Sequence, residues 1–236
     1  MTISTSKIWA IVPAAGQGKR FSEDKPKQFF ELNGQLIAEH SLSRLLALPK
    51  IAAIIVPCDI ASHGWSQVPS LQNPKIQQVE GGEQRVHSVL NGIIAVSQSA
   101  SDDDWILVHD IARPCITSED INQLITAVSN HPVGGILSTS VDETLKKIGS
   151  DNHIEATVDR ADYRLAQTPQ IFRYKVLKDA IAACLENNII PTDEASAIEY
   201  VGLRVLNVEG RRDNIKITRQ EDLPIASAIM KSQEVK

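Results

Sequence analysis

The residues that most constrain this chain lie near its N-terminus, at positions 8–27. Residues 8–12 form a short apolar run, which predicts a fully buried strand. The chain then turns at Pro13 into the run Ala-Ala-Gly-Gln-Gly over 14–18. Because most of these residues have almost no side chain, a ligand can approach the backbone closely.

Four cationic side chains accompany this turn: Lys19, Arg20, Lys25 and Lys27. Free backbone N–H groups at the end of a strand, surrounded by cations, are suited to binding phosphate. The alternative, a strand followed by a flexible surface turn, explains the glycines but not the cations. The sequence lacks the G-x-x-x-x-G-K-[ST] motif, and Phe21 occupies the third position of a G-x-G-x-x-G motif. We therefore predict that residues 13–20, here called the phosphate loop, bind a nucleoside triphosphate.

The composition limits the remaining classes of protein. A chain of 236 residues with 42% hydrophobic residues can form one large domain with a full core. The net charge of -5 disfavours binding to nucleic acid, as does the aromatic content of 4%. The cations of the phosphate loop are therefore expected to form a local site.

Cysteine usage and hydropathy bear on the compartment. The chain has only Cys58, Cys115 and Cys184, an odd number without the spacing of a metal site. Free thiols of this kind are typical of a cytoplasmic protein. No apolar run has the length of a membrane span, and we see no signal-peptide pattern at the N-terminus.

Apolar strands alternate with helical patterns over the first 141 residues. We predict strands at 8–12, 53–56, 76–79, 105–109 and 134–141, with helices at 37–48, from 83 onward and from 117 onward. This order indicates an α/β fold with a mostly parallel sheet and helices on both faces. Ligands bind beyond the carboxyl ends of such strands, where the phosphate loop, Gly82 and Asp110 are all expected to lie.

The alternation then stops. Residues 144–148 and 154–158 predict two strands around a Gly-Ser-Asp-Asn turn, which is a hairpin signal. A hairpin this short has no core of its own, so we expect 140–160 to be an arm that packs against a second subunit. No linker or repeat is apparent, and we predict a single domain over 1–236.

The last part of the chain carries weaker signals. We interpret 167–170 as a turn or the start of a strand, 203–208 as a strand and 214–217 as an extended segment. Helices are expected at 174–187 and after Asp193. Thr218 and Glu221 have the spacing of a capping box for a C-terminal helix.

Eight short motifs then resemble one family, the 2-C-methyl-D-erythritol 4-phosphate cytidylyltransferases. They are P-A-A-G-x-G-x-R at 13–20, P-K-Q-F at 26–29, G-G-x-x-R at 81–85, V-H-D-x-A-R-P at 108–114, T-V-D-R at 157–160, Q-T-P-Q-x-F at 167–172, T-D-E-A at 192–195 and D-N-I-K-I-T at 213–218. The first motif alone indicates only the wider nucleotidyltransferase superfamily. The full set, in family order over nearly the whole chain, is highly specific.

The resemblance implies a reaction and an assembly. In this family CTP reacts with methylerythritol 4-phosphate, giving the cytidyl diphosphate sugar alcohol and pyrophosphate, with Mg²⁺ or another divalent cation. The fold is Rossmann-like, and the enzyme is a homodimer held by an extended arm. Two positions depart from the family: Ile111 is bulkier than usual, which puts a side-chain role there in doubt, and Glu83 replaces a frequent Asp.

The resemblance also implies roles for individual residues. Pro13 belongs to the first motif, and Ala14, Ala15, Gly16, Gly18, Arg20 and Lys27 would hold the CTP phosphates. Gly82, Glu83 and Ser88 would contact cytosine and its surroundings, and Asp110 would lie by the ribose and the metal. Arg113, Thr144, Arg160, Thr192, Asp213 and Lys216 would form the sugar-phosphate pocket, with Thr144 and Arg160 supplied by the arm of the partner subunit.

The chemistry of this reaction needs charge neutralisation more than a base. The nucleophile is a phosphate monoester whose second pKa is about 6, so it is mostly dianionic near neutral pH. Catalysis would consist of positioning and of offsetting charge by Arg20, Lys27, Arg160, Lys216 and the metal ion.

Simpler interpretations exist for several of these residues. Lys216, between two isoleucines, has the pattern of an exposed residue on an alternating strand. Arg160 lies near two aspartates and could form a surface ion pair. Asp110 could cap a turn, and His109 is expected to be a buried core histidine.

Two alternative functions stay open from the sequence. One is the sister enzyme that acts on ribitol 5-phosphate, against which the T-V-D-R motif with Arg160 counts. The other is a nucleotide-binding module without catalysis, which would have no need of Arg160 and Lys216.

Overall fold

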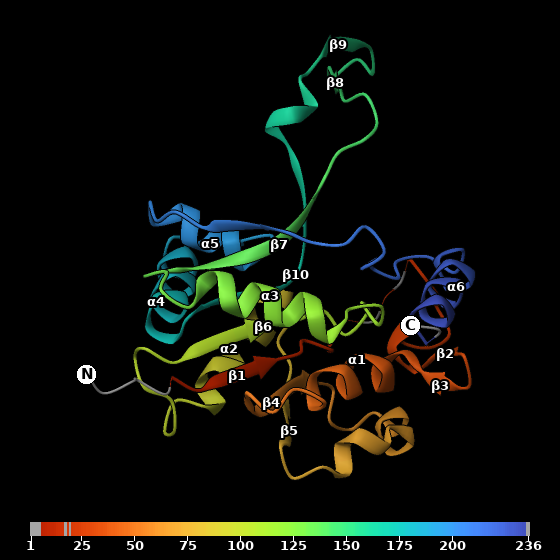
Figure 1. Cartoon of the computed structure of the whole chain (residues 1–236), viewed down its shortest axis with the longest axis vertical. Coiled ribbons are helices and arrows are strands. Elements are labelled where there is room, and N and C mark those ends of the chain that lie inside the picture. The colour runs from red at the N-terminus through yellow and green to blue at the C-terminus, as the bar shows by residue number, and fades with distance from the viewer. Residues whose placement is uncertain (1–5, 17, 19, 235–236) are drawn as a thin grey trace.

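The computed structural model describes residues 6–16, 18 and 20–234. Gln17 and Lys19 of the phosphate loop lie outside these residues. The centre of the molecule is a seven-stranded sheet with the order β11-β7-β10-β6-β1-β4-β5 (Figure 1). Its strands are β1 (Ile8–Ile11), β4 (Ile51–Cys58), β5 (Ile76–Glu80), β6 (Trp105–Val108), β7 (Gly134–Ser140), β10 (Arg164–Arg173) and β11 (Leu206–Glu209).

The sheet is mostly parallel, as the alternation of strands and helices predicts. Strand β10 runs antiparallel to both of its neighbours, β6 and β7, whereas the other neighbouring pairs are parallel. Parallel neighbours need crossover connections, and helices fill them. The carboxyl ends of β1, β4, β5 and β6 therefore meet at one edge of the sheet.

Helices cover both faces of the sheet. They are α1 (Ile37–Leu46), α2 (Arg85–Ala95), α3 (Ser118–Val128), α4 (Tyr174–Glu186) and α5 (Glu194–Tyr200), while α6 (Asp222–Glu234) packs apart from the sheet. Alternate residues of β1 point to opposite faces: Ala10 packs in a cluster with residues of α1 and α3, and Ile11 packs with residues of α2, α4 and α5. This arrangement confirms the predicted α/β class.

A third, smaller core lies where the chain ends. Helix α6 packs its Ala226 and Met230 against Ile217, Phe21 and a short two-stranded ribbon, β2 (Glu31–Leu32) and β3 (Gln35–Leu36). This cluster holds the segment around Ile217 next to the start of the chain. The C-terminal part of the sequence is thereby brought to the edge where β1 ends.

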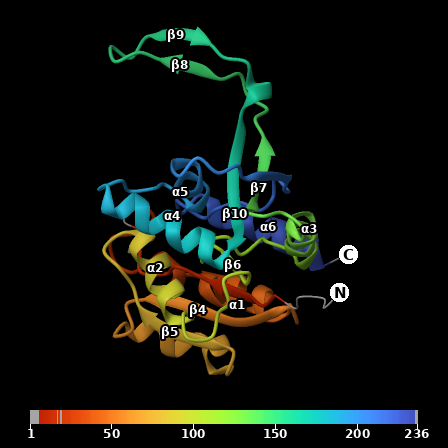
Figure 2. The same ribbon diagram turned by 90° about the vertical axis from the view of Figure 1, so that its left-hand side faces the viewer.

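Residues between β7 and β10 form an arm that leaves the body of the molecule (Figures 1 and 2). Its tip is the hairpin of β8 (Lys146–Ile148) and β9 (Ile154–Thr157), and every residue of both strands is exposed. The short 3-10 helix η4 (Arg160–Asp162) lies in the returning segment. The predicted hairpin is present, and it has no core within its own chain.

The structure adds detail to two segments that have weak sequence signals. Residues 167–170, predicted as a turn or the start of a strand, lie inside β10, where the pairing register shifts and the Thr168–Pro169 peptide is cis. Residues 214–217 are extended but pair with no strand. The segment is held instead by isolated bonds such as the one from Ile217 N–H to Ala112 O, 2.8 Å long.

The C-terminal helix is capped differently from the prediction. The proposed box of Thr218 and Glu221 does not form, because α6 begins only at Asp222. The Asp222 carboxylate instead accepts the backbone N–H groups of Thr218 and Arg219, at 2.7 and 2.9 Å. Thr117, in contrast, forms the expected cap of α3, with Asp120 as its reciprocal partner.

Residues 62–74, which lack a clear period, contain two short 3-10 helices, η2 (His63–Gln67) and η3 (Pro69–Gln72). A third, η1 (Lys27–Phe29), follows the phosphate loop. Within the described ranges, no helix combines the length and the apolar character needed to span a membrane.

Candidate active site

The carboxyl ends of three parallel strands bring the predicted site residues together. Strand β1 leads into the phosphate loop, β5 leads to Gly82, and β6 leads through His109 to Asp110. Their shared edge is where ligands bind in open parallel sheets. Independent motifs therefore meet at one place, as the sequence predicts.

A cavity of about 180 Å³ opens at this edge, and we call it the rim cavity. Its lining consists of Pro13, Ala14, Ala15, Gly16, Lys27, Gln28, Gly82, Glu83, Gln84, Arg85, Ser88, Asp110, Ile111, Ala112 and Lys216. A neighbouring cavity of about 520 Å³ shares Ala14, Ala15 and Gln28 with it. Most residues predicted to bind the nucleotide therefore line one small space.

The phosphate loop is shaped by short contacts with the next segment of chain. Gln28 Nε2 donates to Ala14 O at 2.9 Å, which holds the loop over η1. Gly18 has a φ of +66°, and a Cβ there would lie 3.1 Å from the Cγ atom of Lys27. The positive φ favours glycine at this position. Arg20 is exposed and lies outside the lining of the rim cavity.

Lys27 points from the phosphate loop toward the C-terminal segment. Its Nζ donates to Ile217 O at 2.9 Å. Burial and, to a smaller extent, the neighbouring Lys216 lower the pKa of Lys27 to about 8, while Asp110 acts in the opposite direction. Nearby negative charge thus only partly offsets the positive charge of Lys27 in the free protein, and this favours the binding of an anion next to it.

Asp110 is the centre of the charged network. Its carboxylate lies 2.7 Å from Lys216 Nζ, 3.2 Å from Arg85 Nε and 3.8 Å from Arg113 Nε. Burial alone would raise the pKa of Asp110, but Arg85, Lys216 and Arg113 hold it well below its usual range. The carboxylate is therefore ionised, and its backbone N–H donates to Thr168 Oγ1 at 2.9 Å.

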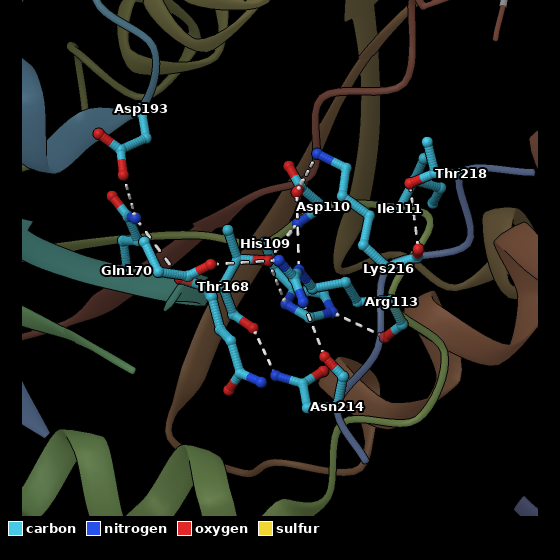
Figure 3. A network of polar contacts seen from close by, with 12 residues as sticks. His109, Asp110, Ile111, Arg113, Thr168, Gln170, Asp193, Asn214, Lys216 and Thr218 are labelled. Carbon is cyan, nitrogen blue, oxygen red and sulfur yellow. Dashed lines mark hydrogen bonds and ion pairs between the residues drawn. The ribbon is translucent and has the colours of Figure 1, made fainter. Parts of the chain in front are cut away.

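Lys216 is exposed, as the simpler interpretation of its sequence pattern holds, but the segment that carries it forms no strand. Its side chain turns toward Asp110, as Figure 3 shows, and lines the rim cavity. Ile217, the next residue, is fully buried in the third core. Packing of Ile217 holds the segment in place, and Lys216 is left facing the cavity.

His109 is the buried core histidine that the sequence predicts. Its Nε2 lies 3.2 Å from Arg113 O and its Nδ1 lies 3.2 Å from Thr168 Oγ1 (Figure 3). Burial lowers its pKa to about 4, so the ring is neutral at physiological pH. Arg113 lies below Asp110, where its Nη1 donates to Asn214 O at 2.7 Å.

The remaining predicted residues lie outside the lining of the rim cavity. Thr192 is exposed directly before α5, and Asp213 pairs with Arg211. Thr144 and Arg160 are exposed on the arm, and neither lines the rim cavity of its own chain. The structure thus gathers the nucleotide and Lys216 side of the predicted site and leaves the arm residues apart.

Two residues of the network had no role in the sequence prediction. Arg85 forms two bonds with the Glu194 carboxylate, 2.6 and 3.0 Å long, in addition to its contact with Asp110. The motifs G-G-x-x-R and T-D-E-A contain these residues, which was the available signal. Their contact across 109 positions of sequence could not be inferred from spacing.

The two departures from the family pattern have different consequences. The Ile111 side chain packs in the core beside α1, and its carbonyl accepts the hydroxyl of Ser41 at 2.7 Å. Only the backbone side of this residue is therefore left for a ligand. Glu83 is exposed at the mouth of the rim cavity.

The fold and the site together define a class. A mostly parallel sheet, with a small-residue loop, several cations and one ionised carboxylate at its carboxyl edge, is the arrangement of an α/β nucleotidyltransferase. Comparison with known proteins then identifies the family. Residues 8–232 match the family described as 2-C-methyl-D-erythritol 4-phosphate cytidylyltransferase, and the chain belongs to it.

Individual relatives agree over almost the full length. A protein of that name from Tolumonas auensis is 46% identical over 226 residues, covering 96% of this chain and 97% of its own. A protein of the same name from Pseudomonas putida strain GB-1 is 44% identical, over 92% of this chain and 92% of its own. The crystal structure of the Francisella tularensis protein of that name is 36% identical, with a TM-score of 0.83 over 95% of this chain and 100% of its own.

Proposed function

We propose that this enzyme transfers the cytidylyl group of CTP to 2-C-methyl-D-erythritol 4-phosphate, giving 4-diphosphocytidyl-2-C-methyl-D-erythritol and pyrophosphate in non-mevalonate isoprenoid biosynthesis. The observation that carries the proposal is the rim cavity. It joins the phosphate loop and Lys27 to Asp110 and Lys216 in one space. Membership of the family supplies the identity of the two substrates.

The reaction forms a bond from the sugar-phosphate oxygen to the α-phosphorus of CTP and breaks the bond from that phosphorus to pyrophosphate. The attacking monoester is already mostly dianionic, since its second pKa is about 6. No side chain has to remove a proton, and His109 is buried and neutral. The protein therefore acts by alignment and by offsetting negative charge.

Lys27 and Lys216 suit this work because both face the rim cavity. We assign the triphosphate to the phosphate loop, Arg20 and Lys27, and the attacking phosphate to Lys216. Lys216 Nζ is bound to Asp110, and its ammonium group has further N–H donors that can bind a substrate phosphate. Gly82, Glu83 and Ser88 are assigned to the base, and Arg113, Thr192 and Asp213 to the sugar-phosphate side.

A divalent cation such as Mg²⁺ fits Asp110. The described residues contain no group of three or more His, Cys, Asp or Glu side chains that could bind a metal by themselves. Mg²⁺ nevertheless needs only one or two carboxylates when substrate phosphates complete its ligands, and the Asp110 carboxylate is ionised. Bound there with CTP, the ion would neutralise phosphate charge.

We also propose a homodimer in which the arm completes the partner's pocket. Thr144 and Arg160 are exposed residues of the arm, which leaves the body of the molecule (Figure 2), and neither lines the rim cavity of its own chain. Large apolar side chains are exposed along the arm, with Ile148 at 51% and Ile154 at 63%. Burying them against a second copy would be favourable. Residues 1–236 would then act as one catalytic domain, with 140–160 as its dimerisation arm.

The compartment follows from the cysteines. All three thiols are free and buried. A protein with unpaired cysteines is typical of a reducing environment, and we assign this enzyme to the cytoplasm. Its negative net charge of -5 disfavours nucleic acid as a partner.

The test is pyrophosphate release from CTP and Mg²⁺, with methylerythritol 4-phosphate and ribitol 5-phosphate in separate reactions. We expect release with methylerythritol 4-phosphate and a loss of about a hundredfold in Lys216→Ala. Lys175→Ala is the matched control, since Lys175 forms an exposed ion pair with Asp179 on α4. Release only with ribitol 5-phosphate would contradict the substrate assignment. CTP binding without release in either reaction would indicate a non-catalytic module.

A further inference from the structure

Arg85 is the first residue of α2 and lies between two buried carboxylates. Its Nη1 and Nη2 donate to Glu194 at 2.6 and 3.0 Å, and its Nε donates to Asp110 at 3.2 Å. The Glu194 side chain is 3% exposed and that of Asp110 is 10% exposed. A planar guanidinium is suited to such a bidentate contact, whereas a lysine could not bind both carboxylates in this geometry.

The two carboxylates differ in whether a second cation, besides Arg85, lies near them. Asp110 is also near Lys216 and Arg113. Glu194 has no other ion-pair partner in the described part of the chain. Arg85 is thus the cation on which the buried Glu194 depends.

Glu194 begins α5, and Thr192, which we assign to the sugar phosphate, stands two residues before it. The turn is anchored on the sheet by Gln170, which donates to Asp193 Oδ2 at 2.8 Å (Figure 3). Gln170 also accepts Ala195 N–H at 3.0 Å. Arg85 anchors its other side to α2. The Arg85–Glu194 ion pair is therefore the charged contact that connects this turn to the nucleotide side of the site.

The start of α2 carries the nucleotide side. Gly82 N–H donates to Ser88 Oγ at 3.0 Å, which folds the loop before the helix against its first turn. Arg85 lies between these two residues in sequence and lines the same cavity. One side chain therefore connects the loop assigned to the base, the carboxylate assigned to the metal, and the turn that carries Thr192.

We propose that Arg85 is a positioning residue, which acts through Glu194 to align the sugar-phosphate turn with the bound nucleotide. This inference rests on the proposed function. All three polar atoms of the guanidinium are engaged by carboxylates. Its effect is therefore on the relative placement of the two substrates.

The experiment compares Arg85→Lys, Glu194→Gln and the double variant with the wild-type enzyme. Glu194→Gln keeps the shape of the side chain and removes its charge. Asp179→Asn is the matched control, because it removes the exposed Lys175–Asp179 pair on α4. The readouts are kcat, KM for each substrate, the Kd for CTP with Mg²⁺ by calorimetry, and the melting temperature.

We expect Glu194→Gln to lower kcat/KM for methylerythritol 4-phosphate at least tenfold, with the Kd for CTP changed less than threefold. Arg85→Lys should show a similar or larger loss. The double variant should lose little more than the worse single variant, since residues that act as a unit are not additive. Asp179→Asn should be unchanged.

Other outcomes would overturn the inference. Steady-state constants of Glu194→Gln within twofold of wild type, combined with a large loss in Arg85→Lys, would mean that Arg85 contacts a substrate directly. If the variants lost equally in every constant and melted near the temperature of the assay, the ion pair would be purely structural. In both of these outcomes the wild-type enzyme is active, so the proposed function stands and only this inference fails. A wild type that released no pyrophosphate would refute the proposed function and this inference with it.

Discussion

Replacing Lys27 by methionine separates the cost of burying a charged side chain from its function. In the folded protein the pKa of Lys27 is lowered from 10.5 to about 8, first by burial and then by Lys216. The folded protein thus binds fewer protons than the unfolded chain between pH 8 and pH 10.5. The free energy of unfolding of the wild type should therefore rise with pH in that window, and Lys27→Met should lack this rise.

The magnitude follows from the linkage between proton binding and stability. One pKa unit corresponds to about 1.36 kcal/mol. Integration from pH 7 to pH 10 gives a gain of about 2.5 kcal/mol for the wild type relative to the variant. The hydrogen bond from Lys27 Nζ to Ile217 O is lost in the variant at every pH. That loss shifts the stability difference by a constant, whereas the pH dependence reports the buried charge.

The assay is urea unfolding at pH 7 and at pH 10 for the wild type, Lys27→Met and Lys25→Met. Lys25 is an exposed cation of the same region, with its Nζ 4.4 Å from the centroid of the Phe30 ring. We expect the difference between Lys27→Met and wild type to fall by about 2.5 kcal/mol over this range, and that of the Lys25→Met control to stay nearly constant. A difference for Lys27→Met that does not depend on pH would refute the reasoning. The variant should also lose most pyrophosphate release at pH 7.

Three further predictions concern other parts of the molecule. Burial raises the pKa of Cys58 to about 11 and that of Cys115 to about 12. A thiol reagent at neutral pH should therefore label these cysteines only after unfolding, and rapid labelling of the native protein would contradict their burial. A Cβ at Gly82 would collide with Cβ of His87. Gly82→Ala should therefore cost about 1–3 kcal/mol of stability and weaken CTP binding in calorimetry. An unchanged Kd for CTP would argue against the assignment of Gly82 to the cytosine base. Ile154→Asp places a charge on the exposed arm and should give monomers with reduced activity in sedimentation and assay; an active monomer would count against the arm as a dimer contact.

Local patterns were sufficient for much of the fold. The apolar runs of β1, β4 and β6 and the helical spacing in α2 and α3 are set by the requirement to bury one side of each element. Their order indicates a parallel sheet, and the edge where ligands bind follows from that topology. The phosphate loop could likewise be recognised because its small residues and cations are contiguous in the sequence.

Weak local signals were a poorer guide to the C-terminal part of the chain. Residues 214–217 were predicted only as an extended segment, and nothing in their pattern indicates that Ile217 is buried in a core built with α6 and β2. The Thr218 box fails because Asp222 accepts the backbone N–H of Thr218, which Glu221 would have accepted in the box. Such competitions depend on neighbours that only the folded chain supplies.

The sequence by itself determined the class of fold, the family and the small-residue phosphate loop, because short runs of contiguous residues and the spacing between them are enough to recognise each of these. Only the tertiary structure decided that Lys216 faces Asp110 and that Arg85 joins Asp110 to Glu194. Those contacts connect elements that are distant in the chain, and no local period encodes them. Their partners are chosen by burial, since a charge removed from water must find an opposite charge nearby.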